Sequence, residues 1–438
     1  MTDEEKKRED FRAVFPLGKH LDAEALKERL AVYGRVFGAL RVFRKPDARR
    51  KCHILVKDNI AVEGFPTTAG SVALSHLRLP ESTAVKRLRE AGFDLFGKTN
   101  MTEFAGFVTT GRPAEGYSHL GGFGRNPHGC FPCGGSSSGS AIAVAAGLCD
   151  AALGTETRGS IMEPALNCGV WGFKPSVGLI SRRGVIPISP VFDTIGVLAR
   201  DAGMLSELLC GMQGDDKVDE TTARASCVHW EDRQDVRTQT FRIGVVRVPG
   251  RAMPDAETQG ILDAVFKKLV DAGIRLTEVV AKDPPENYRL VTSVDFARGI
   301  DDLLKQHADQ DIPADFDALC ALYCKTPSMR PFGMDRMLLA QKLRSEVSEK
   351  DYRQAVAHTV CSNREGIERL LEKNHLDALL FPGRLDWWAL AGSPSLAVPI
   401  GRKKSGKPVG VMLGTAYRAD DTLLGLARVL QACLYSQS

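Results

Sequence analysis

The sequence has no run of eighteen consecutive apolar residues, so it contains no segment typical of a helix that crosses a bilayer. Its first residues, MTDEEKKRED, are charged and lack the apolar stretch of a secretory signal. The eleven cysteines are an odd number, which without an export signal is typical of free thiols in a reducing compartment. We therefore expect a cytoplasmic protein with no membrane partner.

A large excess of charge of one sign is also missing. The 58 basic and 54 acidic residues leave a net charge of +4, whereas nucleic-acid and membrane-surface proteins usually carry a one-signed patch. We expect no nucleic-acid partner. The chain also shows no internal repeat and no low-complexity segment.

A convincing set of metal ligands is absent too. Cys130 and Cys133 form C-x-x-C with His128 close by, and Cys320 and Cys324 form C-x-x-x-C. A structural zinc site needs two well-spaced pairs or a pair with nearby histidines, and these residues do not supply such a set. We expect no metal and no cofactor, and we interpret these cysteines as small, partly buried residues.

What the sequence does contain is an alternation of strand-like and helix-like segments, which predicts an α/β layered sheet. We expect a charged lead-in over residues 1–20 and a single domain over 21–438. Within that domain we distinguish a core at about 50–200, a variable region at about 210–370, mainly helical from 255 to 373, and C-terminal strands and a helix over 371–438.

One phosphate-binding motif is present but is interpreted as fortuitous. Residues 92–99, GFDLFGKT, fit the pattern G-x-x-x-x-G-K-[ST]. A phosphate loop follows a strand and exposes its N–H groups, whereas here a helical segment comes first and the apolar residues look like the strand itself. We therefore expect a strand and no bound nucleotide.

The run CGGSSSGS, residues 133–140, raises the question of which serine does chemistry. It fits G-x-S-x-G with Ser137 at the centre, which is typical of a nucleophile followed by an acid and a histidine. His119 and His128 precede the serines and lack a clear acid partner. We interpret Ser137, Ser138 and Ser140 as helix-capping or supporting residues.

Three segments share a polar residue in an apolar, glycine-framed setting: LVKDNIAVEGFPTTAGS, CGGSSSGSAIAVAAGLC and ALGTETRGSIMEPALNCGVWGFKP. In order and content they resemble the amidase signature family, almost continuously over residues 50–200. The resemblance implies a large, mixed, twisted central sheet with helices on both faces. It also implies a serine hydrolase acting on C–N bonds other than peptide bonds, through a Ser–Ser–Lys triad and an acyl-enzyme.

Carried over by motif, Lys57 is the base, Ser136 is the relay with a cis peptide bond, and Ser160 is the nucleophile. Lys57 lies among Ile54, Leu55, Val56 and Ile60, an apolar setting that favours the neutral amine a base needs. The backbone N–H groups of Thr157, Arg158, Gly159 and Ser160 are expected to form the oxyanion hole.

Two features depart from the family pattern. Arg158 stands where many members have glycine, and we expect it either to pair with Glu156 or Glu163 or to favour a substrate that bears a carboxylate. The segment before residue 391 is short, so Trp387 and Trp388 either wall the acyl pocket or pack in the core.

Three functions remain open from the sequence. The leading one is a free-standing amidohydrolase acting on a small-molecule amide, although an ester or carbamate suits the same machinery. The second is the glutaminase-like component of a tRNA amidotransferase, and the third is a catalytically silent binding scaffold. The size of the chain is compatible with a homodimer.

Overall fold

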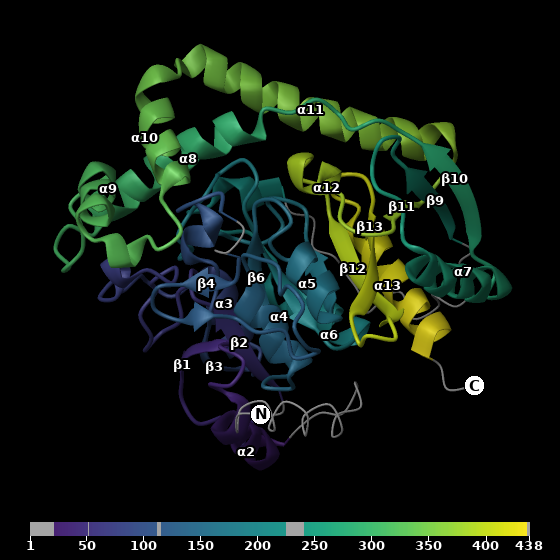
Figure 1. Cartoon of the computed structure of the whole chain (residues 1–438), viewed down its shortest axis with the longest axis horizontal. Helices are drawn as coiled ribbons and strands as arrows, with labels where there is room; N and C mark the ends of the chain where they lie inside the picture. Colours follow the sequence, from purple (N-terminus) through teal and green to yellow (C-terminus); the bar gives the residue numbers. More distant parts are fainter. Residues whose placement is uncertain (1–21, 51, 112–114, 225–240, 436–438) are drawn as a thin grey trace.

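A computed structural model describes residues 22–50, 52–111, 115–224 and 241–435 of the chain. In this part of the chain, eleven strands form one continuous sheet that runs through the molecule (Figure 1). From one edge to the other, the strands are β1 (Leu40–Phe43), β3 (Asp94–Thr99), β2 (His53–Lys57), β6 (Ala151–Glu156), β8 (Thr194–Ala199), β7 (Trp171–Lys174), β12 (Ser395–Arg402), β13 (Pro408–Gly414), β11 (Ala378–Phe381), β9 (Arg242–Arg247) and β10 (Arg275–Val280).

The sheet is mixed. Strand β2 runs parallel to both β3 and β6, and β9 runs parallel to both β10 and β11, whereas the other neighbouring pairs are antiparallel. Because β2, β3 and β6 are parallel, their carboxyl ends lie at the same edge of the sheet. Ligand sites of α/β sheets are typically found at such an edge.

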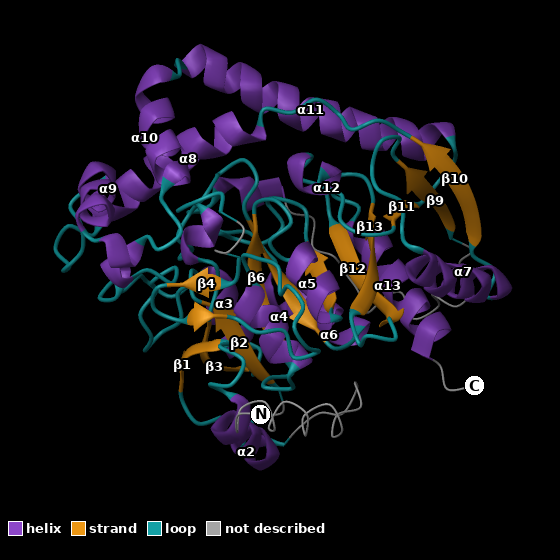
Figure 2. Cartoon of the chain, viewed as in Figure 1, coloured by secondary structure: helices purple, strands orange, loops and turns teal. Residues whose placement is uncertain are grey.

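Helices cover both faces of the sheet, as the side chains of β2 require. Ile54 and Val56 belong to the hydrophobic cluster on one face, and Leu55 belongs to the cluster on the other. Side chains alternate between the faces of a strand, so a strand with consecutive apolar residues at its centre must be covered on both sides. The expected layered α/β fold is confirmed (Figure 2).

The two helical layers are drawn from different parts of the chain. One face packs against α3 (Thr83–Glu90), α6 (Ala202–Met212), α7 (Ala256–Asp271) and α13 (Asp420–Tyr435). The other packs against α2 (Ala23–Tyr33), α4 (Ser138–Ala145), α5 (Met162–Cys168), α12 (Trp387–Leu390) and the C-terminal part of α11 (Glu349–Lys373).

A further group of helices lies beside the sheet and has a hydrophobic cluster of its own. It contains α8 (Tyr288–Gln306), α9 (Phe316–Lys325) and α10 (Asp335–Glu346), drawn in green in Figure 1. Their apolar side chains pack with Phe104 and Phe107, which follow β3 in the chain. This cluster places the variable region of the sequence next to the loops at the edge of the sheet.

Several local expectations can be compared directly with these elements. Asp22 caps α2 through hydrogen bonds from the N–H groups of Glu24 and Ala25 at 3.1 and 2.8 Å. The fortuitous phosphate motif is strand β3, preceded by α3 as expected. Strand β10 lies in a region we expected to be mainly helical. The lead-in, residues 1–20, and residues 225–240 of the polar connector lie outside the described residues.

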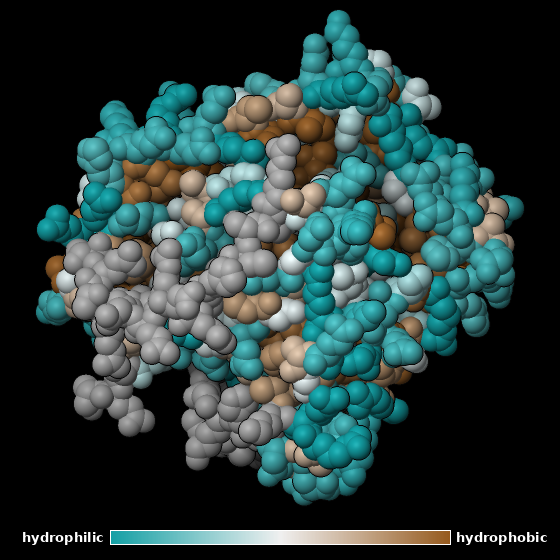
Figure 3. Space-filling model, turned by 180° about the vertical axis from the view of Figure 1, so that it is seen from behind, coloured by the Kyte–Doolittle hydropathy of each residue, from teal (hydrophilic) through white to brown (hydrophobic). Residues whose placement is uncertain are grey.

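No helix in the described part of the chain is both long enough and apolar enough to cross a membrane. The face seen in Figure 3 is largely hydrophilic, and hydrophobic side chains show mainly in hollows between hydrophilic ridges. Large exposed apolar residues, such as Val218 and Met253, are distant in sequence from one another. Isolated apolar residues of this kind are normal on protein surfaces.

Candidate active site

Lys57 is the last residue of β2 and lies at the edge where the parallel strands end. Its side chain is fully buried, and Nζ donates to Ser136 Oγ at 2.8 Å and to Thr155 Oγ1 at 2.9 Å. A third acceptor, the Thr155 carbonyl oxygen, lies at 3.2 Å. The amine is therefore held by neutral oxygens of Ser136, just before α4, and of Thr155, near the end of β6.

The surroundings of Lys57 favour the neutral amine. Burial lowers the pKa of Lys57 from 10.5 to about 7, although the negative charges of Asp193 and Glu156 act in the opposite direction. Within the described residues, Lys57 forms no ion pair with a carboxylate. A lysine with a pKa near neutral pH can serve as a general base.

A second fully buried lysine provides a comparison. Lys98 lies on β3, and its Nζ is 3.6 Å from Asp58 Oδ1. Burial lowers the pKa of Lys98 only to about 8, because the Asp58 carboxylate favours the charged form. Lys57 differs from Lys98 in having no carboxylate within ion-pair distance among the described residues.

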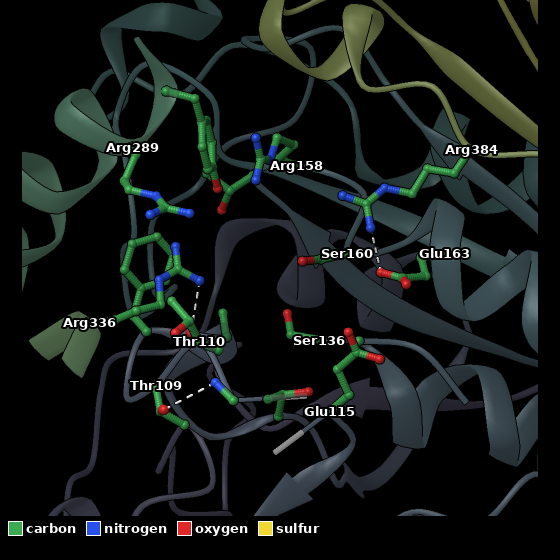
Figure 4. Close-up of a pocket in the computed structure, with 18 of the residues that line it drawn as sticks. Thr109, Thr110, Glu115, Ser136, Arg158, Ser160, Glu163, Arg289, Arg336 and Arg384 are labelled. Carbon is green, nitrogen blue, oxygen red and sulfur yellow. Dashed lines mark hydrogen bonds and ion pairs between the residues drawn. The ribbon is translucent and has the colours of Figure 1, made fainter. Parts of the chain in front are cut away.

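Ser136 lies just before α4, and Ser160 lies in the turn from β6 to α5. A backbone hydrogen bond connects these two segments. The N–H of Ser137 donates to the carbonyl oxygen of Ser160 at 3.0 Å, and the Gly135–Ser136 peptide bond is cis. Both Ser136 and Ser160 line one cavity of about 310 Å³, which we call the serine cavity (Figure 4). The structure thus brings together all three residues that the resemblance assigned to the triad.

The other serines of the run do not line this cavity. Ser137 is fully buried and donates to the Thr155 carbonyl oxygen at 3.1 Å. Ser140 donates to the Leu153 carbonyl oxygen at 2.9 Å, on the same strand. These hydroxyls attach the start of α4 to β6, in agreement with a supporting role. Ser138 Oγ is buried without a hydrogen-bond partner in the described part of the chain.

The turn from β6 to α5 leaves a row of backbone donors unused. In the described part of the chain, no hydrogen bond has the N–H of Thr157, Arg158, Gly159 or Ser160 as its donor. The next two N–H groups, of Ile161 and Met162, donate to Glu156 Oε2 at 2.7 and 3.0 Å. Glu156 therefore satisfies the start of α5, while the free N–H groups stay at the turn that carries Ser160.

Asp193, the residue just before β8, supports the turn from β6 to α5. Its Oδ1 accepts from the Thr157 hydroxyl at 2.6 Å, and its Oδ2 accepts from the N–H groups of Ile188 and Ser189 at 2.7 and 2.9 Å. Burial raises the pKa of Asp193 even though these donors favour the carboxylate. No pattern in the sequence indicated a role for Asp193 at the site, because it lies far along the chain from the turn it supports.

Arg158 pairs with neither of the two carboxylates expected from the sequence. Glu163 bonds to Arg384 at 2.6 Å, and Glu156 caps α5 instead. Arg158 lies with its guanidinium carbon 3.9 Å from the centre of the Tyr288 ring. Its nearest carboxylate oxygens, on Glu286 and Asp386, are 3.8 and 3.7 Å away. The expected Glu156 or Glu163 pair is therefore wrong, because those side chains have other partners.

Trp387 and Trp388 do not line the serine cavity. Both are buried in the cluster on the α4–α5 face of the sheet, and Trp387 Nε1 donates to Asp283 at 2.9 Å. Trp388 lies directly against Gly414, where an added Cβ would meet the indole at 2.3 Å. Of the two alternatives we considered, core packing is the one that the structure shows.

Residues distant in sequence complete the serine cavity. Arg289 and Arg336, from α8 and α10, lie on one side of the serines in Figure 4, and Glu115 lies close to Ser136. Arg384 lies across the cavity, bonded to Glu163 and, at 2.7 Å, to Asp386. Sequence reasoning identified none of these four residues, because no local motif surrounds them.

The histidines and cysteines considered from the sequence lie elsewhere. His128 Nε2 and the Cys168 carbonyl oxygen are 2.9 Å apart, and His119 does not line the serine cavity. Within residues 22–50, 52–111, 115–224 and 241–435, no group of three or more His, Cys, Asp or Glu side chains is arranged to hold a metal ion.

A buried lysine, two serines and a row of free N–H groups thus lie together where parallel strands of the mixed sheet end. A model of the amidase family matches residues 51–385. The chain belongs to the amidase family.

Individual relatives agree with this assignment. A probable amidase of Arabidopsis thaliana is 33% identical over 395 residues, covering 85% of this chain and 75% of the relative. The glutamyl-tRNA(Gln) amidotransferase A subunit of Lachnoclostridium phytofermentans is 32% identical over 397 residues, covering 88% and 75%. The native peptide amidase of Stenotrophomonas maltophilia superposes with a TM-score of 0.85 at 29% identity, covering 95% of each chain.

Proposed function

We propose that this protein is an amidohydrolase that cleaves a C–N amide bond of a small molecule through an acyl-enzyme on Ser160. Ser160 and Ser136 both line the serine cavity, and Ser136 Oγ lies 2.8 Å from Nζ of the buried Lys57, within hydrogen-bond distance. That contact is the observation that carries the proposal. Membership of the amidase family supports hydrolysis of a C–N bond.

The proton pathway starts at neutral Lys57. The amine accepts the proton of the Ser136 hydroxyl, and Ser136 in turn takes the proton of Ser160. The Ser160 oxygen then attacks the amide carbonyl carbon and forms a tetrahedral intermediate. When the C–N bond breaks, Ser136 donates a proton to the leaving nitrogen of the substrate and takes a proton back from Lys57. The product amine therefore leaves uncharged, and Lys57 is neutral again.

The free N–H groups of the β6–α5 turn provide the electrostatic part. As the carbonyl oxygen becomes negative, N–H groups in the row from Thr157 to Ser160 donate to it. Losing one donor of this kind typically costs about 3 kcal/mol of transition-state stabilisation. Asp193 acts as a positioning residue, because it holds the Thr157 hydroxyl. The same relay then activates a water molecule, which attacks the acyl-enzyme and releases the acid.

The test is covalent labelling with a fluorophosphonate probe, followed by peptide mass spectrometry. We expect one adduct, on Ser160. Lys57→Met keeps the length and burial of the side chain but removes the base, so we expect labelling to slow by at least 100-fold. Ser137→Ala is the matched control from the same loop, and its labelling rate is expected to stay within a few-fold of the original.

Two outcomes would contradict the proposal. An adduct on Ser137 that persists in the Lys57→Met variant would favour an esterase-like nucleophile. Folded protein that gives no adduct on any serine would favour the silent scaffold. Hydrolysis is measured in parallel on a panel of anilides, esters and carbamates, since the same relay suits all three.

The amidotransferase relatives support a second candidate, a glutaminase that works with partner proteins. Identity to these relatives is 30–33% over 395–425 residues in several organisms, close to that of the plant amidase. Activity of the isolated chain separates the two. An amidohydrolase turns over without partner protein, tRNA or ATP, whereas a glutaminase of the second kind releases ammonia from glutamine efficiently only in its complex.

A further inference from the structure

The charges around the serine cavity are distributed unevenly. Arg384 is neutralised by hydrogen bonds to Glu163 at 2.6 Å and to Asp386 at 2.7 Å. Arg289 and Arg336, on the other side of the serines, pair with no carboxylate among the described residues. We call these two residues the cationic wall.

The cationic wall is held at the cavity by packing rather than by opposite charge. Arg336 is half-buried, donates to the Gly106 carbonyl oxygen at 2.9 Å and stacks at 3.9 Å on the Phe107 ring. In Figure 4 its guanidinium lies near that of Arg289. Burial lowers the pKa of Arg336, and the positive charges of Arg158 and Arg289 act in the same direction. Three guanidinium groups thus face one region of the cavity.

Such an arrangement is costly without an anion. Like charges repel more strongly when they are partly buried, and a guanidinium offers a planar pair of donors that matches a carboxylate. Glu286, which also lines the cavity, and Asp386 lie 3.8 and 3.7 Å from Arg158, so they offset the charge of Arg158, and neither forms an ion pair with the cationic wall. Glu115 lies close to Ser136, across the serines from the cationic wall, and repels an anion from that side (Figure 4).

We propose that the amide substrate carries a carboxylate group, which Arg289 and Arg336 bind while the amide carbonyl lies at Ser160. This inference rests on the proposed function and adds the class of substrate. The carboxylate neutralises the wall, and its position fixes the orientation of the substrate between the wall and Glu115.

The experiment compares 4-nitroanilides that share a leaving group and differ in the charge of the acyl chain. Glutaryl 4-nitroanilide carries the carboxylate, 5-methylhexanoyl 4-nitroanilide is its apolar isostere, and 5-aminopentanoyl 4-nitroanilide carries an amine. Malonyl, succinyl and adipoyl homologues vary the distance from carbonyl to carboxylate. A matching set of N-acyl 4-aminobenzoates and N-acyl 4-toluidides places the charge on the amine side.

We expect the best carboxylate-bearing amide to exceed its apolar isostere by roughly 10- to 100-fold in kcat/KM, as for hydrogen bonds to charged groups. The double variant Arg289→Met/Arg336→Met is expected to lose this preference, measured as the ratio of the kcat/KM values of the two substrates with the same variant. Arg353→Met, an exposed arginine of α11 outside the cavity, controls for the loss of positive charge. Raised salt is expected to reduce the preference.

Several outcomes separate this inference from the proposed function. Efficient hydrolysis of the isostere with no preference for any carboxylate, in either series, overturns the inference and leaves the amidohydrolase standing. A preference for a phosphonate analogue over the carboxylate also overturns it. If no amide of the panel is hydrolysed, protection of Ser160 against the fluorophosphonate decides: glutaramate protects and its uncharged isostere 5-methylhexanamide does not if the inference holds, and equal protection or none refutes it.

Discussion

The pH dependence of hydrolysis follows directly from the burial of Lys57. Its pKa of about 7, against 10.5 for an exposed lysine, corresponds to about 5 kcal/mol in favour of the neutral amine. Because the relay starts from that form, kcat/KM is expected to follow the neutral fraction. The value of kcat/KM is expected to be about half of its plateau at pH 7, about one hundredth of the plateau at pH 5, and almost constant above pH 8.

A substitution beside the amine moves this curve in a known direction. Thr155 Oγ1 accepts from Lys57 at 2.9 Å, and an ammonium loses more than an amine when such an acceptor is removed. Thr155→Val therefore lowers the pKa of Lys57 further, and the acidic limb is expected to move down by roughly 0.5–1 pH unit.

The assay is kcat/KM for an uncharged amide between pH 5 and 9.5 at constant ionic strength, with circular dichroism at each pH to establish folding. A plateau from pH 8 upward, with only about a twofold rise between pH 7 and 9, is the expected result. A rise of about 100-fold over that interval would show a lysine of ordinary pKa and refute the reasoning. A profile without an acidic limb would show that Lys57 is not the base.

Three further predictions concern stability and geometry. Lys57→Met is expected to stabilise the fold by about 1–3 kcal/mol at pH 6, because the folded state disfavours the ammonium; the gain disappears toward pH 10, where the unfolded lysine also loses its proton, and calorimetry across this range measures it. Asp193→Asn removes a charge that raises the pKa of Lys57, so the acidic limb moves to lower pH, while the weaker hydrogen bonds of an amide oxygen to the N–H groups of Ile188 and Ser189 destabilise the fold by about 1–3 kcal/mol in denaturant titrations. Gly159→Ala places a Cβ 2.5 Å from Arg384 Nε at a residue with φ of +77°, and kcat/KM is expected to fall at least 100-fold; a change under threefold in a folded variant contradicts this geometry.

The sequence predicts the parts of the site that depend on local patterns. The apolar residues Ile54, Leu55 and Val56 before it bury Lys57, and glycines frame the loops that carry Ser136 and Ser160. The contact between Lys57 and Ser136 agrees with the geometry that the family resemblance implies, whereas proton transfer along it stays a prediction.

The sequence does not predict the far side of the serine cavity, for physical reasons. Arg289 and Arg336 lie on two different helices and are 47 residues apart in the sequence, and a single arginine on such a helix usually faces solvent. Only the packing of α8 and α10 brings them together. Trp387 and Trp388 were considered from the sequence, but their place could not be predicted, because large aromatic residues suit a pocket wall and a core equally well. Strand β10 was missed because it is a largely exposed edge strand with mixed polarity.

The hydrophobic cluster of α8, α9 and α10 is separate from the two clusters that cover the sheet. The strands that carry and support Lys57 pack in the clusters of the sheet, whereas the cationic wall lies on helices α8 and α10, which pack in the third cluster. Substitutions on these two helices can change which molecules are accepted without disturbing the stability of the sheet. For an engineer, this separation makes the solvent-facing and cavity-facing positions of α8 and α10 the natural place for a library that seeks new substrates with unchanged chemistry.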